Sequence, residues 1–121
     1  MQNQRILITT TPTIAGYRIA AVYGEVFGVI VRSRGLAGNL MAGLRSLGGG
    51  EINEYTQLLE QTRNDAMARM SERAIAMGAN AVVSMRFDSS AIGDIMSEIV
   101  AYGTAVGIVA DTSAQAPGTQ E

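Results

Sequence analysis

The sequence predicts an α+β domain: an antiparallel sheet, with one long strand and a hairpin, packed against one long and one short helix. Three observations carry this prediction: an apolar strand pattern over residues 17–33, helical periodicity over 51–77, and two closing strand patterns at 80–87 and 97–109. With 121 residues, of which 47% are hydrophobic, the chain fits one packed domain rather than a disordered chain. We therefore expect a single domain over residues 1–110.

Two strands open the chain. The run ILITT at residues 6–10 is β-branched and aliphatic, which is typical of a short strand, and Pro12 and Gly16 then favour a turn. In the next pattern, YRIAAVYGEVFGVIVRS, both alternating faces are mostly apolar, so we expect both to be covered. A straight strand of this length would reach about 50 Å. We therefore expect bulges or bends at Gly24 and Gly28, with one end of the strand against a neighbouring subunit.

The middle of the chain predicts two helices. GLAGNLMAGLRSL favours a short helix over residues 37–47, and the glycines at 48–50 interrupt the chain after it. From Glu51 to Met77, apolar residues recur at three- and four-residue steps with charged residues between them. This pattern predicts a long amphipathic helix, which Gly78 can end in a left-handed conformation.

The closing strand patterns predict a hairpin. Alternate residues over 81–87 are expected to share one face of the first strand, and small residues over 101–107 to line one face of the second. The small residues would let a helix lie close on the sheet. If residue 86 pairs with residue 98, Arg86 and Glu98 become cross-strand neighbours of opposite charge.

The amino-acid composition excludes several classes of function. The chain has no Cys and no His, which removes their nucleophilic and acid–base chemistry and the usual zinc ligands. The net charge is −2 and there is no basic face to neutralise phosphates, so we expect no nucleic-acid partner. The N-terminus lacks a signal-peptide pattern, and the longest apolar stretch near the end falls short of the roughly 20 residues of a bilayer span. We expect a cytoplasmic protein without a membrane partner, with a disordered polar tail over 111–121.

Three carboxylates near the hairpin are the candidate metal ligands: Asp88, Asp94 and Glu98. Carboxylate oxygens suit a hard cation, although their spacing does not match a calcium-binding loop. We favour the simpler explanation that they form the polar turn of the hairpin. In a symmetric ring each carboxylate would recur around the axis, which keeps the metal site open as an alternative.

Two other groups favour packing and charge roles over ligand binding. The methionines at helical spacing and on the following strand are typical of core or interface residues. A row of arginines on the long helix could hold an anion, but its acidic neighbours favour a solvated or intersubunit charged face. The residues are Met67, Met70, Met77 and Met85, and Arg63, Arg69 and Arg73.

Several short signatures occur in one order along the chain. They are TTP at 10–12 with Gly16, the pair Gly24 and Gly28, GG before the helix that contains Tyr55, GANAVV at 78–83 and AYGTAV at 101–106. Over about residues 6–109 the chain thus resembles the YbjQ-like family of putative heavy-metal-binding proteins. The resemblance implies an α+β subunit, a homopentameric ring, and a function that is still unassigned.

These observations leave three hypotheses. The first is a structural or binding ring without catalysis, a homo-oligomer of five copies, with Tyr17, Tyr23, Phe27 and Val29 as interface or core residues. The second is a metal-binding ring that uses carboxylates repeated around the axis, and a metal ion is then its one cofactor. The third is a small-molecule binder or enzyme with a site between subunits.

Overall fold

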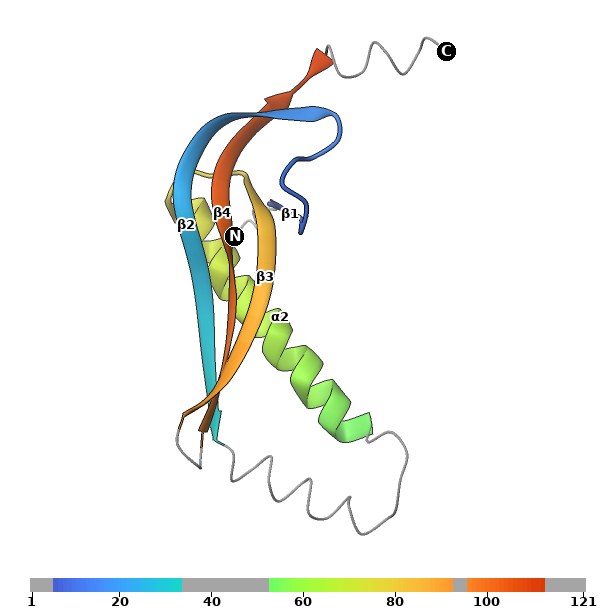
Figure 1. The fold of residues 1–121 in the computed structure, drawn as a ribbon, viewed down its shortest axis with the longest axis vertical. Coiled ribbons are helices and arrows are strands. Elements are labelled where there is room, and N and C mark those ends of the chain that lie inside the picture. Colours follow the sequence, from blue (N-terminus) through green and yellow to red (C-terminus); the bar gives the residue numbers. More distant parts are fainter. Residues whose placement is uncertain (1–5, 34–52, 93–95, 113–121) are drawn as a thin grey trace, which may run out of the picture.

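The protein is described here by a computed structural model, which covers residues 6–33, 53–92 and 96–112. It confirms the α+β class: one long helix lies against one face of a four-stranded sheet with strand order β1-β3-β4-β2 (Figure 1). The expected short helix at 37–47 and the glycines at 48–50 lie outside the described residues. The elements are β1 (Leu7–Ile8), β2 (Tyr17–Ser33), α2 (Asn53–Ala76), β3 (Ala81–Ile92) and β4 (Met96–Ala110).

The sheet is mixed, whereas the sequence predicted an antiparallel sheet. β4 pairs antiparallel with both β2 and β3, but β1 pairs parallel with β3. Because β1 and β2 therefore run in the same direction, residues 9–16 must carry the chain back to the end where β2 begins. This returning segment lies on the sheet, and its Ile14 packs against a cluster that includes Val83 and Val106.

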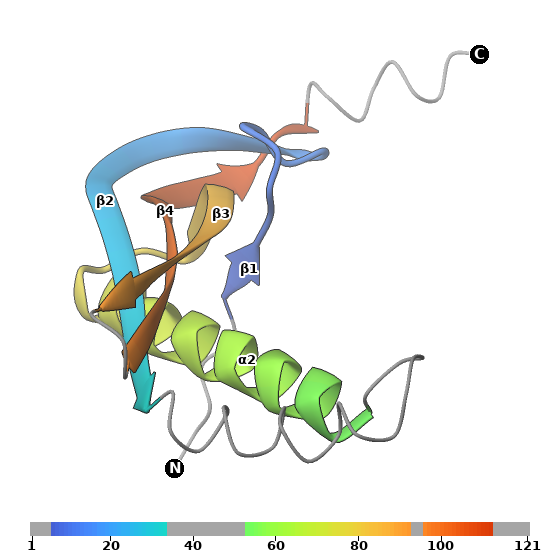
Figure 2. The same ribbon diagram turned by 60° about the horizontal axis from the view of Figure 1, so that its bottom comes forward.

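The long strand β2 is confirmed over Tyr17–Ser33, and it is strongly bent (Figure 2). Its register with β4 shifts twice, the second time between Val22 and Gly24, and Gly24 has a φ of 119°. Gly24 is therefore an irregular position, as predicted. Gly28 has a different role, because an added Cβ there would collide with the carbonyl oxygen of Ala66 and lie 2.5 Å from the Met70 nitrogen. Gly28 is where the helix backbone reaches the strand.

A bulge in β3 inverts the alternation of its side chains. Ser84 has a φ of 56°, and the register with β4 shifts between Val83 and Arg86. Before the bulge Val83 packs with Ile14 on the face away from α2, whereas Met85, after it, joins the core under the helix. The prediction that alternate residues over 81–87 share one face is therefore wrong, since one inserted residue exchanges the two faces.

The main core lies between α2 and the sheet. Small residues of β4 face the helix, as predicted, and the helix contributes small residues of its own. Gly78, with a φ of 98°, ends the helix as expected: its N–H donates to Ile75 and the N–H of Ala79 donates to Ala74. Within the described residues, no helix is long and apolar enough to cross a membrane. The innermost residues are Val26, Ala66, Met70, Ala74, Val82, Ala101 and Ala105.

Candidate functional site

The sheet face away from α2 presents an ordered set of side chains between the bulges and the hairpin. Since Gly28 faces the helix, its neighbours in β2 point the other way. The strand registers align the side chains of this face in three rows across β2, β4 and β3. We call the surface made by these nine residues the open face; its rows are Phe27–Tyr102–Arg86, Val29–Val100–Asp88 and Val31–Glu98–Ser90.

The open face has an apolar centre and a polar margin. Phe27, Val31 and Tyr102 keep 45%, 50% and 42% of their surface exposed. Single exposed apolar residues are ordinary on a protein surface, but here they are contiguous over β2 and β4. The charged and hydroxyl side chains lie mainly along β3. An aromatic and aliphatic centre bordered by polar groups is the composition of a protein–protein interface.

Two arginines of α2 reach the free edge of β2, the outermost strand beside this face. Arg69 donates from Nη1 to the carbonyl oxygen of Val29 at 3.0 Å, and Arg73 donates to that of Phe27 at 3.1 Å. The Arg73 guanidinium also lies 5.4 Å from the centre of the Phe27 ring. A strand pairing along this edge would have to displace both side chains from their carbonyl acceptors.

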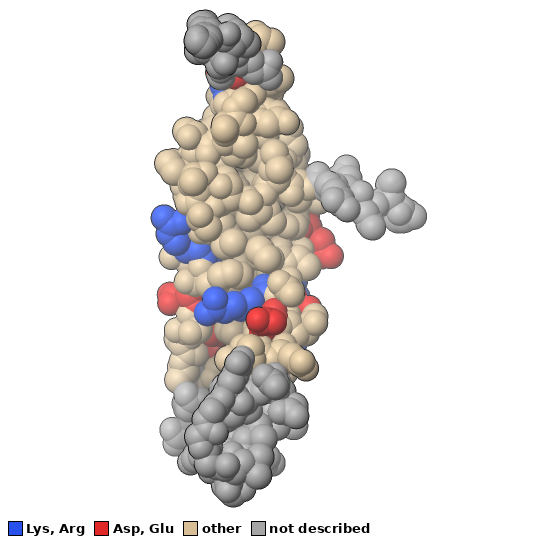
Figure 3. Space-filling view, turned by 90° about the vertical axis from the view of Figure 1, so that its right-hand side faces the viewer, with Lys and Arg blue, Asp and Glu red and all other residues tan. Residues whose placement is uncertain are grey.

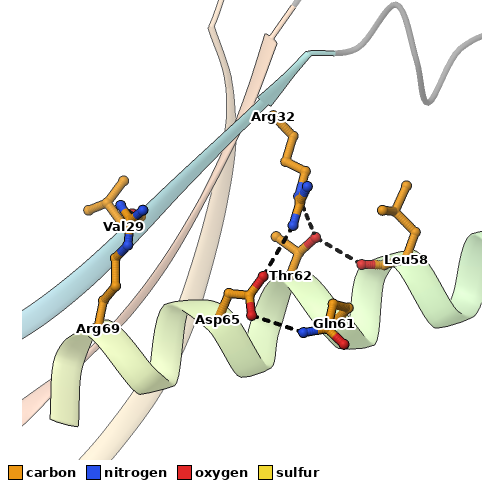
Figure 4. Close-up of polar contacts among 7 residues, drawn as sticks. All are labelled: Val29, Arg32, Leu58, Gln61, Thr62, Asp65 and Arg69. Atoms are coloured by element: carbon orange, nitrogen blue, oxygen red, sulfur yellow. Dashed lines mark hydrogen bonds and ion pairs between the residues drawn. The ribbon is translucent and has the colours of Figure 1, made fainter. Parts of the chain in front are cut away.

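A third arginine fixes the end of β2 to the helix (Figure 4). Arg32 donates from Nε to the Thr62 hydroxyl at 2.9 Å and forms an ion pair of 3.2 Å with Asp65. Thr62, which is 2% exposed, donates in turn to the carbonyl of Leu58, and Gln61 donates to the second oxygen of Asp65. The ion pair is half exposed and adds little stability, so its main effect is to orient Arg32.

Two of the candidate metal ligands, Asp88 and Glu98, do not lie in a hairpin turn. β3 continues to Ile92 and β4 begins at Met96, so Asp88 and Glu98 lie inside the strands and on the open face. Asp88 is opposite Val100, and Glu98 is opposite Ser90, which makes the two carboxylates diagonal neighbours. Asp94 lies outside the described residues. Within the described part of the chain, no group of three or more Asp, Glu, His or Cys side chains could hold a metal ion.

The conditional pairing of Arg86 with Glu98 is wrong. The register places Arg86 opposite Tyr102, because the two strands continue to Ile92 and from Met96, so that Glu98 pairs with Ser90 instead. Arg86 instead donates to the carbonyl oxygens of Thr10, at 3.0 Å, and Met85, at 2.9 Å. It thereby ties the returning segment 9–16 to the edge of the open face.

The four predicted interface or core residues do not form one cluster. Phe27 and Val29 lie on the open face. Tyr23 lies near the end of α2, because an added Cβ at Gly78 would be 3.7 Å from its ring. Tyr17 is at the opposite end of β2 from the open face, where it lines a surface hollow.

The hollow has a volume of about 400 Å³ and is mostly apolar. Asn80 is one of its few polar side chains, and its amide is engaged with the backbone N–H and carbonyl of Ile108. Seen from the right-hand side of Figure 1, charged side chains gather in a band across the middle, and most of the upper surface carries none (Figure 3). Because Asn80 is already engaged with Ile108 and most of the other lining residues are aliphatic, the hollow lacks the convergent polar groups of a specific ligand site. It is lined by Ile6, Leu7, Tyr17, Asn80, Ile108, Val109 and Ala110.

Sequence reasoning missed the carbonyl contacts of Arg69 and Arg73. Their spacing of four residues places both on one side of the helix, which was the available signal. Arg63 belongs to another side, since its guanidinium lies 4.9 Å from the centre of the Phe87 ring. The acceptors could not be predicted, because they depend on which strand lies at the edge of the sheet.

Comparisons with known proteins agree with this fold. A solved structure from Pediococcus pentosaceus, a protein of unknown function, matches with a TM-score of 0.58 at 15% identity and covers 86% of this chain and 98% of that one. Among curated proteins, a UPF0145 protein of Methanocella arvoryzae is 54% identical over 93% of both chains. A UPF0145 protein of Thermoplasma acidophilum is 58% identical over 84% of this chain and 85% of its own.

The family comparison covers nearly the whole domain. The family model described as "putative heavy-metal-binding" matches residues 6–109. This range begins just before β1 and ends one residue before the end of β4, so it includes every described element except the last residue of β4. The chain belongs to this YbjQ family, whose curated members at 54–58% identity are UPF0145 proteins.

Proposed function

We propose that the protein is a homo-oligomeric ring of five copies with a structural or binding role rather than a catalytic one. The observation that carries the proposal is the open face, where Phe27, Val31 and Tyr102 are exposed together. Burying this face against another copy would remove apolar surface from water, at roughly 25 cal/mol per Å². The number of copies, five, is what the resemblance to the YbjQ-like family implies.

The composition supports a role without catalysis. The chain contains no His, Cys or Lys, so the imidazole, thiol and amine groups that act as general base or nucleophile in many enzymes are missing. Tyr102 and Ser90 have hydroxyl groups on the open face, but their neighbours in the rows are Phe27, Arg86 and Glu98. A surface of this composition suits contact with another protein better than bond making.

Native mass spectrometry of the untagged protein tests the proposal. At micromolar concentration we expect one dominant species with five times the mass of the chain. Analytical ultracentrifugation over a dilution series is the matched solution measurement, and it should give the same stoichiometry. A protein that stays monomeric at micromolar concentration in both measurements would refute the ring.

A metal-binding ring is the second candidate, and the placement of Asp88 and Glu98 on one face of adjacent strands favours it. A single described chain offers only this pair, so a complete site would need oxygen ligands from neighbouring copies. Carboxylate ligands select a hard cation such as Mg²⁺ or Ca²⁺ over a soft metal.

Purification without chelator or an affinity-tag metal, followed by elemental analysis, tests this candidate. We expect a stoichiometric metal in the wild-type protein and its loss in Asp88→Asn. Ser90→Ala, on the same strand and face, is the control that should keep the metal. Equal metal content in Asp88→Asn and the wild type would eliminate this carboxylate as a ligand.

A further inference from the structure

The arginine edge, which we define as Arg69 and Arg73, carries charge that no described carboxylate neutralises. Their hydrogen-bond acceptors are the backbone carbonyls of Val29 and Phe27. Among the described residues, the ion pair shorter than 4.0 Å is Arg32–Asp65, which lies further along β2 and α2. The arginine edge therefore presents two guanidinium groups with donors to spare beside the apolar centre of the open face.

The other side of the open face has the opposite charge. Asp88 and Glu98, which we call the acidic side, form no ion pair with the described residues. Asp88 Oδ1 accepts a hydrogen bond from the N–H of its own neighbour, Ser89, at 2.9 Å. Arg86 lies close by on β3 but donates to the carbonyls of Thr10 and Met85. Among the described residues, one surface thus has two arginines without an ion pair along the β2 edge and two carboxylates without an ion pair on β3 and β4.

We propose that neighbouring copies meet head to tail, with the arginine edge of one copy on the acidic side of the open face of the next. The partner is a second copy of this chain, because both halves of the charge complement occur on every copy. When copies join through two different surfaces, a linear row of copies has one free surface at each end. The two free surfaces meet and the row closes into a ring when the rotation between neighbouring copies permits it. The inference therefore rests on the ring that we propose as the assembly.

The arginine edge also determines which kind of contact can form. An exposed edge strand would ordinarily recruit another strand through its backbone groups. Here the outward carbonyls of Phe27 and Val29 already accept from Arg73 and Arg69. The contact therefore forms through side chains. The apolar residues of the open face supply the buried area, and the charges fix the orientation.

Charge exchange within one chain tests the proposal. We expect Arg73→Glu and Asp88→Arg, made singly, each to weaken assembly about tenfold or more, because each places like charges opposite one another. The double variant, R73E with D88R, restores the opposite charges with the signs exchanged and should assemble within about threefold of the wild type. Analytical ultracentrifugation gives the association constants, and higher salt should weaken wild-type assembly.

The controls separate assembly from folding. Arg63→Glu makes the same charge change on the same helix, but at the residue that stacks on Phe87, so assembly should stay unchanged. A merely destabilised R73E chain would not be rescued by D88R. A second exchange, R69E with E98R, repeats the test with different residues.

Each remaining outcome is decisive. A wild-type ring whose single variants assemble normally, or whose double variants do no better than the singles, would overturn the head-to-tail contact and leave the ring intact. A charge-sensitive dimer would also overturn it, because two copies related by a two-fold axis use the same surface twice. A monomeric wild type would instead refute the proposed function itself.

Discussion

Gly28→Ala should destabilise the folded chain by about 3 kcal/mol, near the upper end of the usual cost of overpacking a core. The added Cβ would meet backbone atoms of Ala66 and Met70, which cannot rotate away as a flexible side chain can. Relief therefore requires α2 to move away from β2, and that would open the packing around Met70, one of the largest fully buried side chains. The free energy of unfolding from urea denaturation, at one fixed protein concentration, measures the effect.

Gly107→Ala is the matched control for this prediction. It is also a glycine of the sheet, but an added Cβ would lie 3.4 Å from the nearest Tyr23 ring carbon, an ordinary packing distance. We expect a change of less than about 1 kcal/mol, within the range of substitutions that add no clash. If Gly28→Ala were as mild as Gly107→Ala, the helix could not be packed as closely on β2 as the structure places it.

The sequence correctly predicted the strands and the helix end whose signals lie in the neighbouring residues. The two-residue alternation of β2 and β4 and the small residues facing the helix could be read directly, and Gly78 supplied the helix end. The bulge at Ser84 had no such signal, since serine rarely adopts a positive φ. It is held by distant partners: the N–H of Ser84 donates to Thr11 at 3.0 Å and that of Met85 to Thr9 at 3.0 Å.

The candidate site could be predicted only in part for the same reason. The apolar alternation of β2 showed that both faces needed cover, but the close approach at Gly28 determines which face α2 takes. Asp88 was expected in the polar turn because no local signal showed that β3 continues beyond Phe87. Its actual position on the open face depends on the strand register, which the bulge at Ser84 shifts.

Tyr102→Glu should abolish assembly while leaving the fold of the single chain intact. Tyr102 lies in β4, between Phe27 of β2 and Arg86 of β3, and thus in the interior of the open face. With 42% of its surface exposed, and outside the buried core clusters, it can be replaced in the monomer at little cost. At a contact between copies, the same change would bury a carboxylate in apolar surroundings and remove an aromatic anchor, at a cost of several kcal/mol. Native mass spectrometry should show monomers, with an unchanged circular dichroism spectrum.

Val109→Glu makes the same kind of change on the same strand, at a residue that is 41% exposed but lies beside the hollow at the other end of β4. If the open face is the contact surface, the Val109→Glu chain assembles as the wild type does, and only Tyr102→Glu dissociates. The opposite result, in which Val109→Glu dissociates and Tyr102→Glu does not, would move the contact to the hollow, where Leu7, Tyr17 and Val109 are also exposed. Because the two variants carry the same charge and alter equally exposed side chains, a difference between them reports position and not chemistry.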